Sequence, residues 1–221
     1  MKIIECTQGS AEWHKARLGI PTASNFDCIV TMGGKGVTGK TRQSYLLQLL
    51  AERITGQLTQ NYVSPAMERG TTLEPQARAW YELTTGCTVQ QVGFALPCEG
   101  GRYGCSPDGL CEDRGIEIKC PLPHTLLGQL LNDAPPEEYY LQVQACMWIT
   151  GRPRWDLVLF SGMSAIPNRI HEISADEKMH AAFAEHVNKF ADDLDAAEAK
   201  LLAIGARRAT ANSNEVGWIN G

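Results

Sequence analysis

Three charged side chains in the middle of the chain have the types and spacing needed for hydrolytic chemistry. Asp108 ends a Ser-Pro-Asp sequence, and Glu117 and Lys119 follow it closely. The alternating run over residues 115–120 is typical of a β-strand, the second strand of a hairpin whose first strand ends near Asp108. Side chains on a strand alternate between faces, so Glu117 and Lys119 share one face and Ile118 lies on the opposite, apolar face.

This arrangement predicts a site for a divalent cation. Two carboxylates without a partner repel each other, and one of them takes up a proton unless a cation neutralises them. Oxygen ligands suit Mg²⁺, with Mn²⁺ as a substitute. A metal held by Asp108 and Glu117 would activate a water and neutralise charge on a phosphodiester. Lys119 would then either help deprotonate that water or stabilise the transition state, which is the chemistry of a nuclease.

The three-residue pattern is short and has an ordinary explanation. A surface hairpin with a solvated pair between Glu117 and Lys119 would show the same residues. Other segments of the chain are needed to separate the two interpretations.

Two segments near the N-terminus are candidates for binding a phosphate. Residues 11–18 are predicted to form a short helix, on which Trp13 and Arg17 share one face. An aromatic ring beside a guanidinium can stack on a base and hold a phosphate. Thr22 and Ser24 precede a second short helix, whose first N–H groups form an anion site. The alternative for the first segment is a packed tryptophan beside a surface arginine.

Residues 34–41 match the P-loop pattern G-x-x-x-x-G-K-[ST] and raise the alternative of nucleotide hydrolysis. A P-loop follows a buried strand, whereas residues 26–32 favour a helix. No apolar strand ending in aspartate supplies a second magnesium ligand. We therefore interpret the segment as a basic, glycine-rich loop near DNA, with Lys35 and Lys40 as contacts and no nucleotide cofactor.

Hydrophobic periodicity and capping signals predict the remaining elements. Helices are expected over 42–55, 64–85, 136–150 and 174–205, and strands over 88–96, 102–105, 155–161 and 168–173. Ser174-Ala175-Asp176-Glu177 is typical of a capping box at the start of the last helix. That helix should be structural, with an apolar stripe facing the core.

The predicted helix over 64–85 carries one further candidate. Its core-facing side chains are expected to be Met67, Gly70, Ala77, Trp80 and Tyr81. Glu74 and Arg78 are four residues apart, so they form either a surface ion pair or a third carboxylate with its partner beside the metal.

Length and composition indicate a single domain over residues 1–221, with the helix at about 174–205 packed on its core. The apolar runs are too short to span a bilayer, and no signal-peptide pattern opens the chain, so we expect a cytoplasmic protein without a membrane partner. The net charge of −5 does not exclude DNA binding, because a local basic channel suffices.

Four ordered segments together resemble the family of phage lambda exonuclease, the YqaJ-type viral recombinases among the PD-(D/E)xK nucleases. The segments that carry the resemblance are 11–24, 70–78, 105–121 and 139–150. It implies an α/β, restriction-endonuclease-like fold, with a central mixed sheet flanked by helices. It also implies a Mg²⁺-dependent, processive exonuclease that degrades the 5′-phosphorylated strand of duplex DNA, in the cytoplasm of a bacterial host.

The resemblance also implies partners and residue roles. The partners would be two further copies in a homotrimeric ring, and a single-strand annealing protein that takes the 3′ overhang into recombination. The metal ligands would be Asp108, Glu117, the Ile118 carbonyl and Glu74, with Lys119 next to the water. Tyr139 and Gln142 would support this site. The pocket for the 5′-phosphate would consist of Arg17, Ser24 and Ser106, with Trp13 and Thr22 beside it.

Three other functions stay open from the sequence. A restriction-like or structure-specific endonuclease can use the same metal site. A non-catalytic DNA-binding subunit would not need Asp108, Glu117 and Lys119 together. A nucleotide switch would depend on Lys40.

Overall fold

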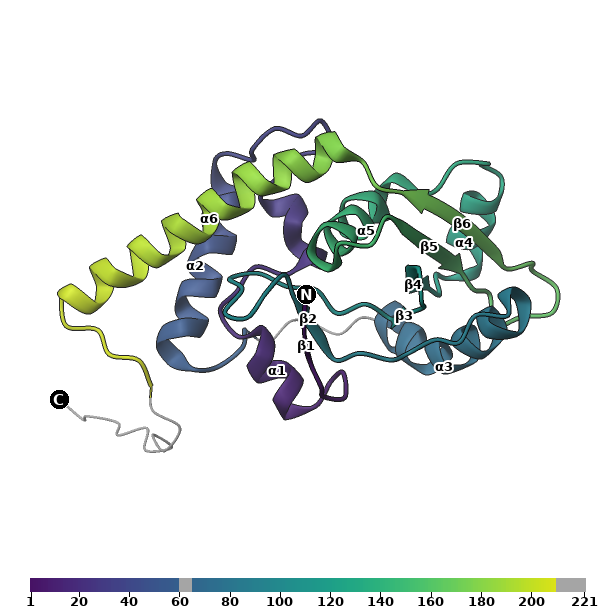
Figure 1. The fold of residues 1–221 in the computed structure, drawn as a ribbon, viewed down its shortest axis with the longest axis horizontal. Helices are drawn as coiled ribbons and strands as arrows, with labels where there is room; N and C mark the ends of the chain where they lie inside the picture. The colour runs from purple at the N-terminus through teal and green to yellow at the C-terminus, as the bar shows by residue number, and fades with distance from the viewer. Residues whose placement is uncertain (60–64, 210–221) are drawn as a thin grey trace.

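A four-stranded mixed sheet lies in the right-hand half of the molecule as it is seen in Figure 1. The computed structural model describes residues 1–59 and 65–209. The strands run in the order β3-β4-β5-β6, with bounds β3 Gly109–Leu110, β4 Arg114–Lys119, β5 Arg154–Leu159 and β6 Arg169–Ser174. Strands β4 and β5 are parallel, whereas β3 and β6 pair antiparallel with their neighbours. The predicted mixed sheet flanked by helices is therefore confirmed.

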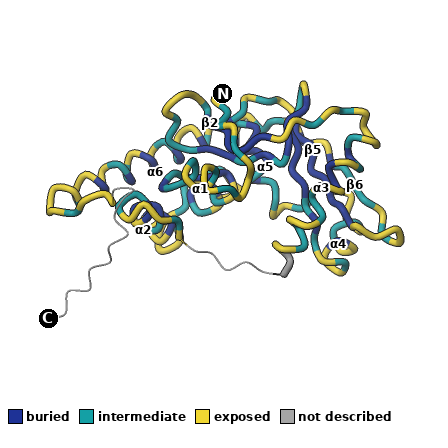
Figure 2. The backbone as a smooth tube through the Cα atoms, turned by 90° about the horizontal axis from the view of Figure 1, so that it is seen from below, coloured by how far each residue is buried: buried dark blue, intermediate teal, exposed yellow. Residues whose placement is uncertain are grey.

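Helices cover both faces of this sheet. Helix α5 (Glu137–Thr150) packs against the face that carries Trp155 and Leu157 of β5, and helix α3 (Pro65–Thr85) packs against the face that carries Ile118 and Val158. Figure 2 shows that burial is concentrated along β5 and α5. Because the sheet lies between α5 and α3, successive side chains of β4 point toward opposite helices.

The N-terminal part forms a second layer of structure beside the sheet. Strands β1 (Lys2–Ile4) and β2 (Phe94–Leu96) pair antiparallel. Helix α1 (Ala11–Arg17) begins at Ser10, whose side chain accepts a hydrogen bond from the Trp13 N–H at 3.2 Å. A 3₁₀ helix, η1 (Ala23–Cys28), and helix α2 (Lys40–Thr55) follow. The predicted helices over 11–18 and 42–55 are therefore confirmed. The second short helix forms as η1, but the expected capping is wrong, because the Thr22 side chain makes no capping hydrogen bond and Ser24 lies inside the helix.

The last helix, α6 (Glu177–Ala203), runs along α2 and extends past the rest of the molecule (Figure 1). Its predicted apolar stripe is confirmed by the buried side chains of Met179, Phe183, Val187, Phe190 and Leu194. Among the described residues, no helix is long and apolar enough to cross a membrane.

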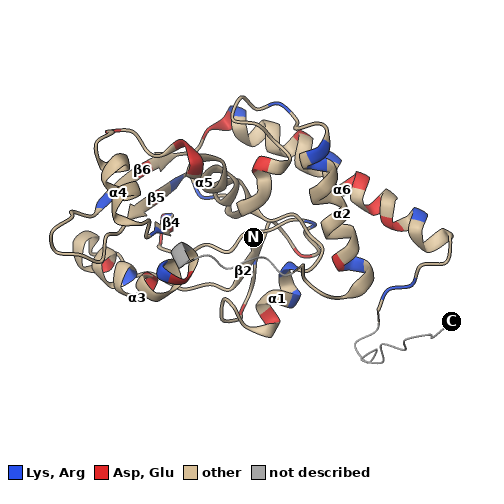
Figure 3. Cartoon of the chain, turned by 180° about the vertical axis from the view of Figure 1, so that it is seen from behind, with Lys and Arg blue, Asp and Glu red and all other residues tan. Residues whose placement is uncertain are grey.

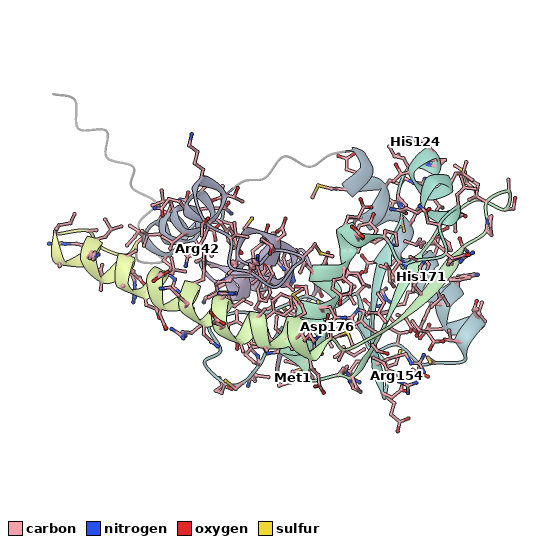
Figure 4. The ribbon with its side chains drawn as sticks, turned by 90° about the horizontal axis from the view of Figure 1, so that it is seen from above. Met1, Arg42, His124, Arg154, His171 and Asp176 are labelled. Atoms are coloured by element: carbon pink, nitrogen blue, oxygen red, sulfur yellow. The ribbon has the colours of Figure 1, made fainter. Side chains whose placement is uncertain are left out.

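The acidic run on α6 forms ion pairs with basic residues from other segments. Figure 3 shows acidic positions along α6 next to basic positions of α2, and Figure 4 labels Arg42, one of these basic residues. Asp193 contacts Arg42 of α2 at 2.5 Å, and Asp195 contacts Arg53 of α2 at 2.6 Å. Arg102 contacts Asp192 at 2.6 Å. The first two pairs join α6 to α2, and the third joins it to the segment between β2 and β3, so much of the charge of this acidic run is neutralised within the fold.

Several local expectations are wrong. Helix α6 begins at Asp176, whose carboxylate accepts from the N–H groups of Lys178 and Met179 at 2.9 and 3.1 Å, while Ser174 ends β6. Asp108 precedes the first hairpin strand instead of ending it, because β3 begins at Gly109. Met67 is 54 % exposed, so it does not face the core. The expected start of α3 at Ser64 lies outside the described residues.

Other elements were shorter than expected or missed. Of the strand expected over 88–96, only Phe94–Leu96 forms, and the segment 102–105 contributes single bridges through Gly104 and Cys105. Helix α4 (Pro123–Leu130) was not expected, because two prolines precede its apolar residues. The sequence match to a P-loop over residues 34–41 is not accompanied by P-loop architecture, as expected, since η1 and a turn closed by the bridge between Val30 and Gly36 take the place of the preceding strand.

Gly115 of β4 occupies a position where a side chain does not fit. A Cβ at this position would lie 2.3 Å from the ring of Trp155 on the neighbouring strand. We expect Gly115→Ala to lower the free energy of unfolding by about 1–3 kcal/mol, because the core has no room for the extra atom. Chemical denaturation monitored by circular dichroism measures this change.

Gly128→Ala is the matched control, because no atom of the described residues outside the helix backbone lies within 4 Å of a Cβ at that position on α4. The helix propensity of alanine should stabilise this variant by about 0.5–1 kcal/mol. Destabilisation of both variants by the same amount would contradict the role assigned to the contact between Gly115 and Trp155.

Candidate active site

Asp108, Glu117 and Lys119 converge near the C-terminal end of β4, as their spacing predicts. The Asp108 carboxylate accepts a hydrogen bond from the Ile118 N–H at 2.6 Å, which fixes it beside β4. Lys119 Nζ lies 2.8 Å from Glu117 Oε1. Glu117 and Lys119 both face α5, whereas Ile118 packs toward α3. Two carboxylates and an ammonium therefore form a single cluster.

Burial and mutual repulsion give this cluster unusual electrostatics. Burial, followed by the charges of Glu117 and Glu74, raises the pKa of Asp108 well above its usual range. Burial alone would lower the pKa of the Lys119 ammonium, but the neighbouring carboxylates Glu117 and Asp108 outweigh it and raise that pKa. Lys119 is therefore held in its charged form, which suits it to stabilise negative charge.

One oxygen of Glu117 fits a divalent cation. Glu117 Oε2 is buried and has no hydrogen-bond partner among the described residues, whereas Oε1 is engaged by Lys119 and Gln142. A buried carboxylate oxygen without a donor is costly, and a metal ion would satisfy it. With Asp108 on the same site, the donor set consists of the oxygens that Mg²⁺ prefers.

Glu74 is near the site but is turned toward an arginine. Its carboxylate forms an ion pair with Arg78, one helical turn along α3. Glu74, Arg78 and Asp108 line the same cleft, which has a volume of about 690 Å³. In the described part of the chain, no three His, Cys, Asp or Glu side chains are grouped as a ready metal site. Glu74 is thus placed to act on the cluster through its charge or through water.

Gln142 and Tyr139 of α5 contact the cluster as expected. Gln142 Nε2 donates to Glu117 Oε1 at 2.6 Å, and its Oε1 accepts from Lys119 Nζ at 3.1 Å. Lys119 Nζ lies 5.1 Å from the centre of the Tyr139 ring. The Tyr139 hydroxyl in turn accepts from Gln129 of α4 at 3.3 Å. These contacts fix the position of the ammonium in three directions.

Trp13, Arg17 and Ser106 form a second cluster next to the first. Trp13 Nε1 and Arg17 Nη1 both donate to Ser106 Oγ, at 2.8 and 3.0 Å. The Arg17 guanidinium lies 4.2 Å from the centre of the Trp13 ring. Because the Ser106 oxygen accepts twice, its own hydrogen remains available to a third group. Ser106 is two residues from Asp108, so the two clusters are adjacent.

Backbone pairing brings Thr22, and with it Ser24, close to this second cluster. Thr22 pairs with Gly104 in a parallel bridge, which brings it beside the segment that carries Ser106. Its hydroxyl oxygen lies 3.3 Å from that of Ser24. Thr22 itself is buried, and its N–H donates to the Tyr45 hydroxyl, so Ser24 is the more accessible member of the pair.

Lys35 and Lys40 belong to a different region. A Cβ at Gly34 would contact Ala182, and one at Gly36 would contact the His186 ring, so the glycine-rich loop packs against α6. Lys40 is the first residue of α2. The structure therefore does not join either lysine to the cluster around Asp108.

Two residues that contact the segment next to Asp108 were missed as site residues. Gln8 donates to the Pro107 carbonyl, and Arg78 donates to the Asp108 carbonyl. The only sequence signals were the position of Gln8 in a turn and the spacing of Arg78 from Glu74.

Comparison with known proteins agrees with this geometry. Residues 12–153 match the model of the YqaJ-like viral recombinase domain. The chain belongs to the YqaJ-like viral recombinase family. This match includes both side-chain clusters described above, and the predicted family membership is thus confirmed.

Solved structures extend the likeness over nearly the whole chain of this family member. It is 34 % identical to the alkaline exonuclease LHK-Exo from Laribacter hongkongensis, with a TM-score of 0.79 over 89 % of this chain and 98 % of that chain. The complex of LHK-Exo with dAMP gives 35 % identity and a TM-score of 0.78 over the same shares. The expected PD-(D/E)xK type of fold is confirmed.

A more distant structure shares the fold alone. The phage-related exonuclease from Haemophilus somnus 129PT is 14 % identical, with a TM-score of 0.57 over 90 % of this chain and 97 % of that chain. None of the curated proteins compared with the chain matches it significantly.

Proposed function

We propose that this protein is a Mg²⁺-dependent exonuclease that degrades the 5′-phosphorylated strand of duplex DNA from its end. The observation that carries the proposal is the segment Ser106-Pro107-Asp108. Ser106 belongs to the cluster with Trp13 and Arg17, and Asp108 belongs to the cluster with Glu117. An end phosphate bound at the first cluster would place a nearby phosphodiester at the second. Membership of the viral recombinase family and likeness to an alkaline exonuclease support the same activity.

The metal ligands in this proposal are Asp108, Glu117 and the Ile118 carbonyl, with Glu74 acting through water. Mg²⁺, or Mn²⁺ in its place, would supply an activated water and charge neutralisation when bound. Glu117 Oε2 is the oxygen that such an ion would satisfy.

The protein side chains have separate tasks in the reaction. The Lys119 ammonium would stabilise the negative charge that develops on the phosphoryl oxygens. Gln142 holds both Lys119 and Glu117, so it fixes their separation. Arg17 and Ser106 bind the 5′-phosphate, because a guanidinium and a free hydroxyl hydrogen both suit phosphate oxygens. Trp13 supports Arg17 by stacking and forms one wall of the cleft.

The activity is tested with linear duplex DNA labelled separately at each end, with Mg²⁺ or with a chelator, beside covalently closed circular duplex. We expect the 5′ label to be released first, only with Mg²⁺, while closed circles remain intact. Cleavage of closed circles would instead support the endonuclease that shares this site chemistry. No cleavage of any substrate would support a non-catalytic DNA-binding subunit.

The proposal includes a homotrimeric ring and an annealing protein that receives the 3′ overhang. Family membership is the support for both. A ring that encircles the DNA does not diffuse away between cleavages, which would account for processive digestion. Sedimentation of the same preparation gives the mass of the assembly, and a monomeric mass on DNA would contradict the ring.

A further inference from the structure

The Pro107-Asp108 segment precedes β3 and pairs with no strand in the described part of the chain. Two side chains from distant parts of the chain bind its successive carbonyl oxygens. Gln8 Nε2 donates to the Pro107 carbonyl at 2.8 Å and to the Val92 carbonyl at 3.0 Å. One amide group therefore ties this segment to the backbone that leads into β2.

Arg78 of α3 binds the next carbonyl, that of Asp108. Its Nε donates to the Asp108 carbonyl at 3.3 Å, and its Nη2 pairs with Glu74. Arg78 is only 9 % exposed, and Gln8, Arg78 and Asp108 all line the 690 Å³ cleft. A buried guanidinium that binds a carbonyl and a carboxylate at once has a fixed orientation.

Together these contacts define where the Asp108 carboxylate points. The backbone of Asp108 is held by Arg78, the preceding peptide by Gln8, and the carboxylate by the Ile118 N–H. A metal ligand must be held to within about 0.5 Å of its productive position. Loss of either backbone contact would keep the Asp108 carboxylate as a possible ligand. The segment that carries it could then move, so its position would no longer be fixed.

We propose that Gln8 and Arg78 are positioning residues that orient Asp108 toward the divalent cation. This inference rests on the proposed function, because it assigns Asp108 as a metal ligand. Arg78 has a second effect in this role, since it keeps Glu74 beside the site by an ion pair. Neither residue needs to touch DNA or the reacting atoms.

Arg78→Lys is the first test variant. Lysine keeps the positive charge, but its single ammonium cannot replace the fork that joins the Asp108 carbonyl to Glu74. Arg53→Lys is the matched control, because Arg53 also donates through Nε to a main-chain carbonyl, that of Gly19 at 2.7 Å, and pairs with carboxylates. Gln8→Met is the second test variant, since it keeps the shape of the side chain and removes both donated hydrogen bonds.

The measurement is the affinity of the DNA-free protein for Mg²⁺ by titration calorimetry, together with the thermal unfolding midpoint and the kcat and KM for duplex DNA. We expect Arg78→Lys to weaken Mg²⁺ binding by about 10–100-fold, the usual effect of removing a group that orients a ligand. Its kcat at fixed Mg²⁺ should fall while the KM for DNA changes little. Arg53→Lys should bind Mg²⁺ like the wild type, whatever its unfolding midpoint.

Unchanged Mg²⁺ affinity in folded Arg78→Lys would overturn the inference, as would equal weakening in Arg53→Lys. If Arg78→Lys does not fold, Gln8→Met decides the question by the same affinity measurement, because Gln8 lies at the surface. A wild-type protein that neither binds Mg²⁺ nor cuts DNA would refute the proposed function itself. A wild-type protein that binds Mg²⁺, with variants that bind it equally well, would refute only the positioning role of Gln8 and Arg78.

Discussion

Lys119→Ala should lower the kcat for DNA cleavage by about 10²–10³-fold, the usual effect of removing one donor to a developing oxyanion. The ammonium is held 2.8 Å from Glu117 Oε1 and 3.1 Å from Gln142 Oε1, and its pKa is raised, so it is charged under all ordinary conditions. DNA binding should persist, because Arg17 and Ser106 do not depend on Lys119. Single-turnover cleavage and a separate DNA-binding titration measure the two effects.

Lys189→Ala is the control for this variant. The Lys189 side chain is 70 % exposed on α6, and its one described ion pair, with Asp193, is a surface contact between residues four apart. Its removal should leave cleavage unchanged. Thermal unfolding in the presence of Mg²⁺ checks that Lys119→Ala is folded, since loss of the ammonium leaves Glu117 and Asp108 without a cationic side chain. Turnover near the wild-type rate in Lys119→Ala would remove its catalytic role.

The cluster of Asp108, Glu117 and Lys119 was predictable because the pattern that indicates it lies within one short stretch of sequence. Alternation between polar and apolar residues along β4 fixes the faces of Glu117, Ile118 and Lys119, whatever the rest of the fold. Gln142 and Tyr139 were expected only from the family resemblance, because nothing in the spacing of α5 shows which strand it packs against. In the structure, α5 packs beside β4, and Gln142 forms hydrogen bonds with Lys119 and Glu117 of that strand.

The contacts that orient Asp108 were not predictable, because they join residues that are far apart in the sequence. Gln8 is separated from Pro107 by 99 positions, and Arg78 from Asp108 by 30. Such pairs depend on how β1, α3 and β3 come together, which no short pattern records. Helix α4 was missed because Pro123 reads as a loop residue, although proline is compatible with the first turn of a helix.

Charge along α6 also depends on residues that are far apart in the chain. The carboxylates of Asp192, Asp193 and Asp195 form ion pairs with arginines of α2 and with Arg102. Nothing in the acidic run itself shows that arginines from other segments reach it. Arg17 belongs to the candidate site, where its partners are a tryptophan ring and a hydroxyl instead of a carboxylate.

Arg17→Ala should reduce kcat/KM on duplexes with a 5′-phosphate by about 10–150-fold, since a hydrogen bond to a charged group contributes about 1.5–3 kcal/mol. Duplexes with a 5′-hydroxyl should be affected much less, because they lack the dianion that the guanidinium binds. Arg17→Lys should give an intermediate loss, as an ammonium keeps the charge but not the planar fork. Parallel digestion of the two kinds of end measures the ratio.

Arg42→Ala is the matched control for Arg17→Ala, because the Arg42 guanidinium also lies over an aromatic ring, 5.0 Å from the centre of Phe190. It pairs with Asp193 and is remote from Ser106, so its loss should lower stability without favouring one kind of end. Burial lowers the pKa of Arg17, yet the group remains charged, so desolvation strengthens its attraction for a phosphate. Equal losses on phosphorylated and hydroxyl ends in Arg17→Ala would show that Arg17 holds Trp13 and Ser106 in place but does not recognise the end.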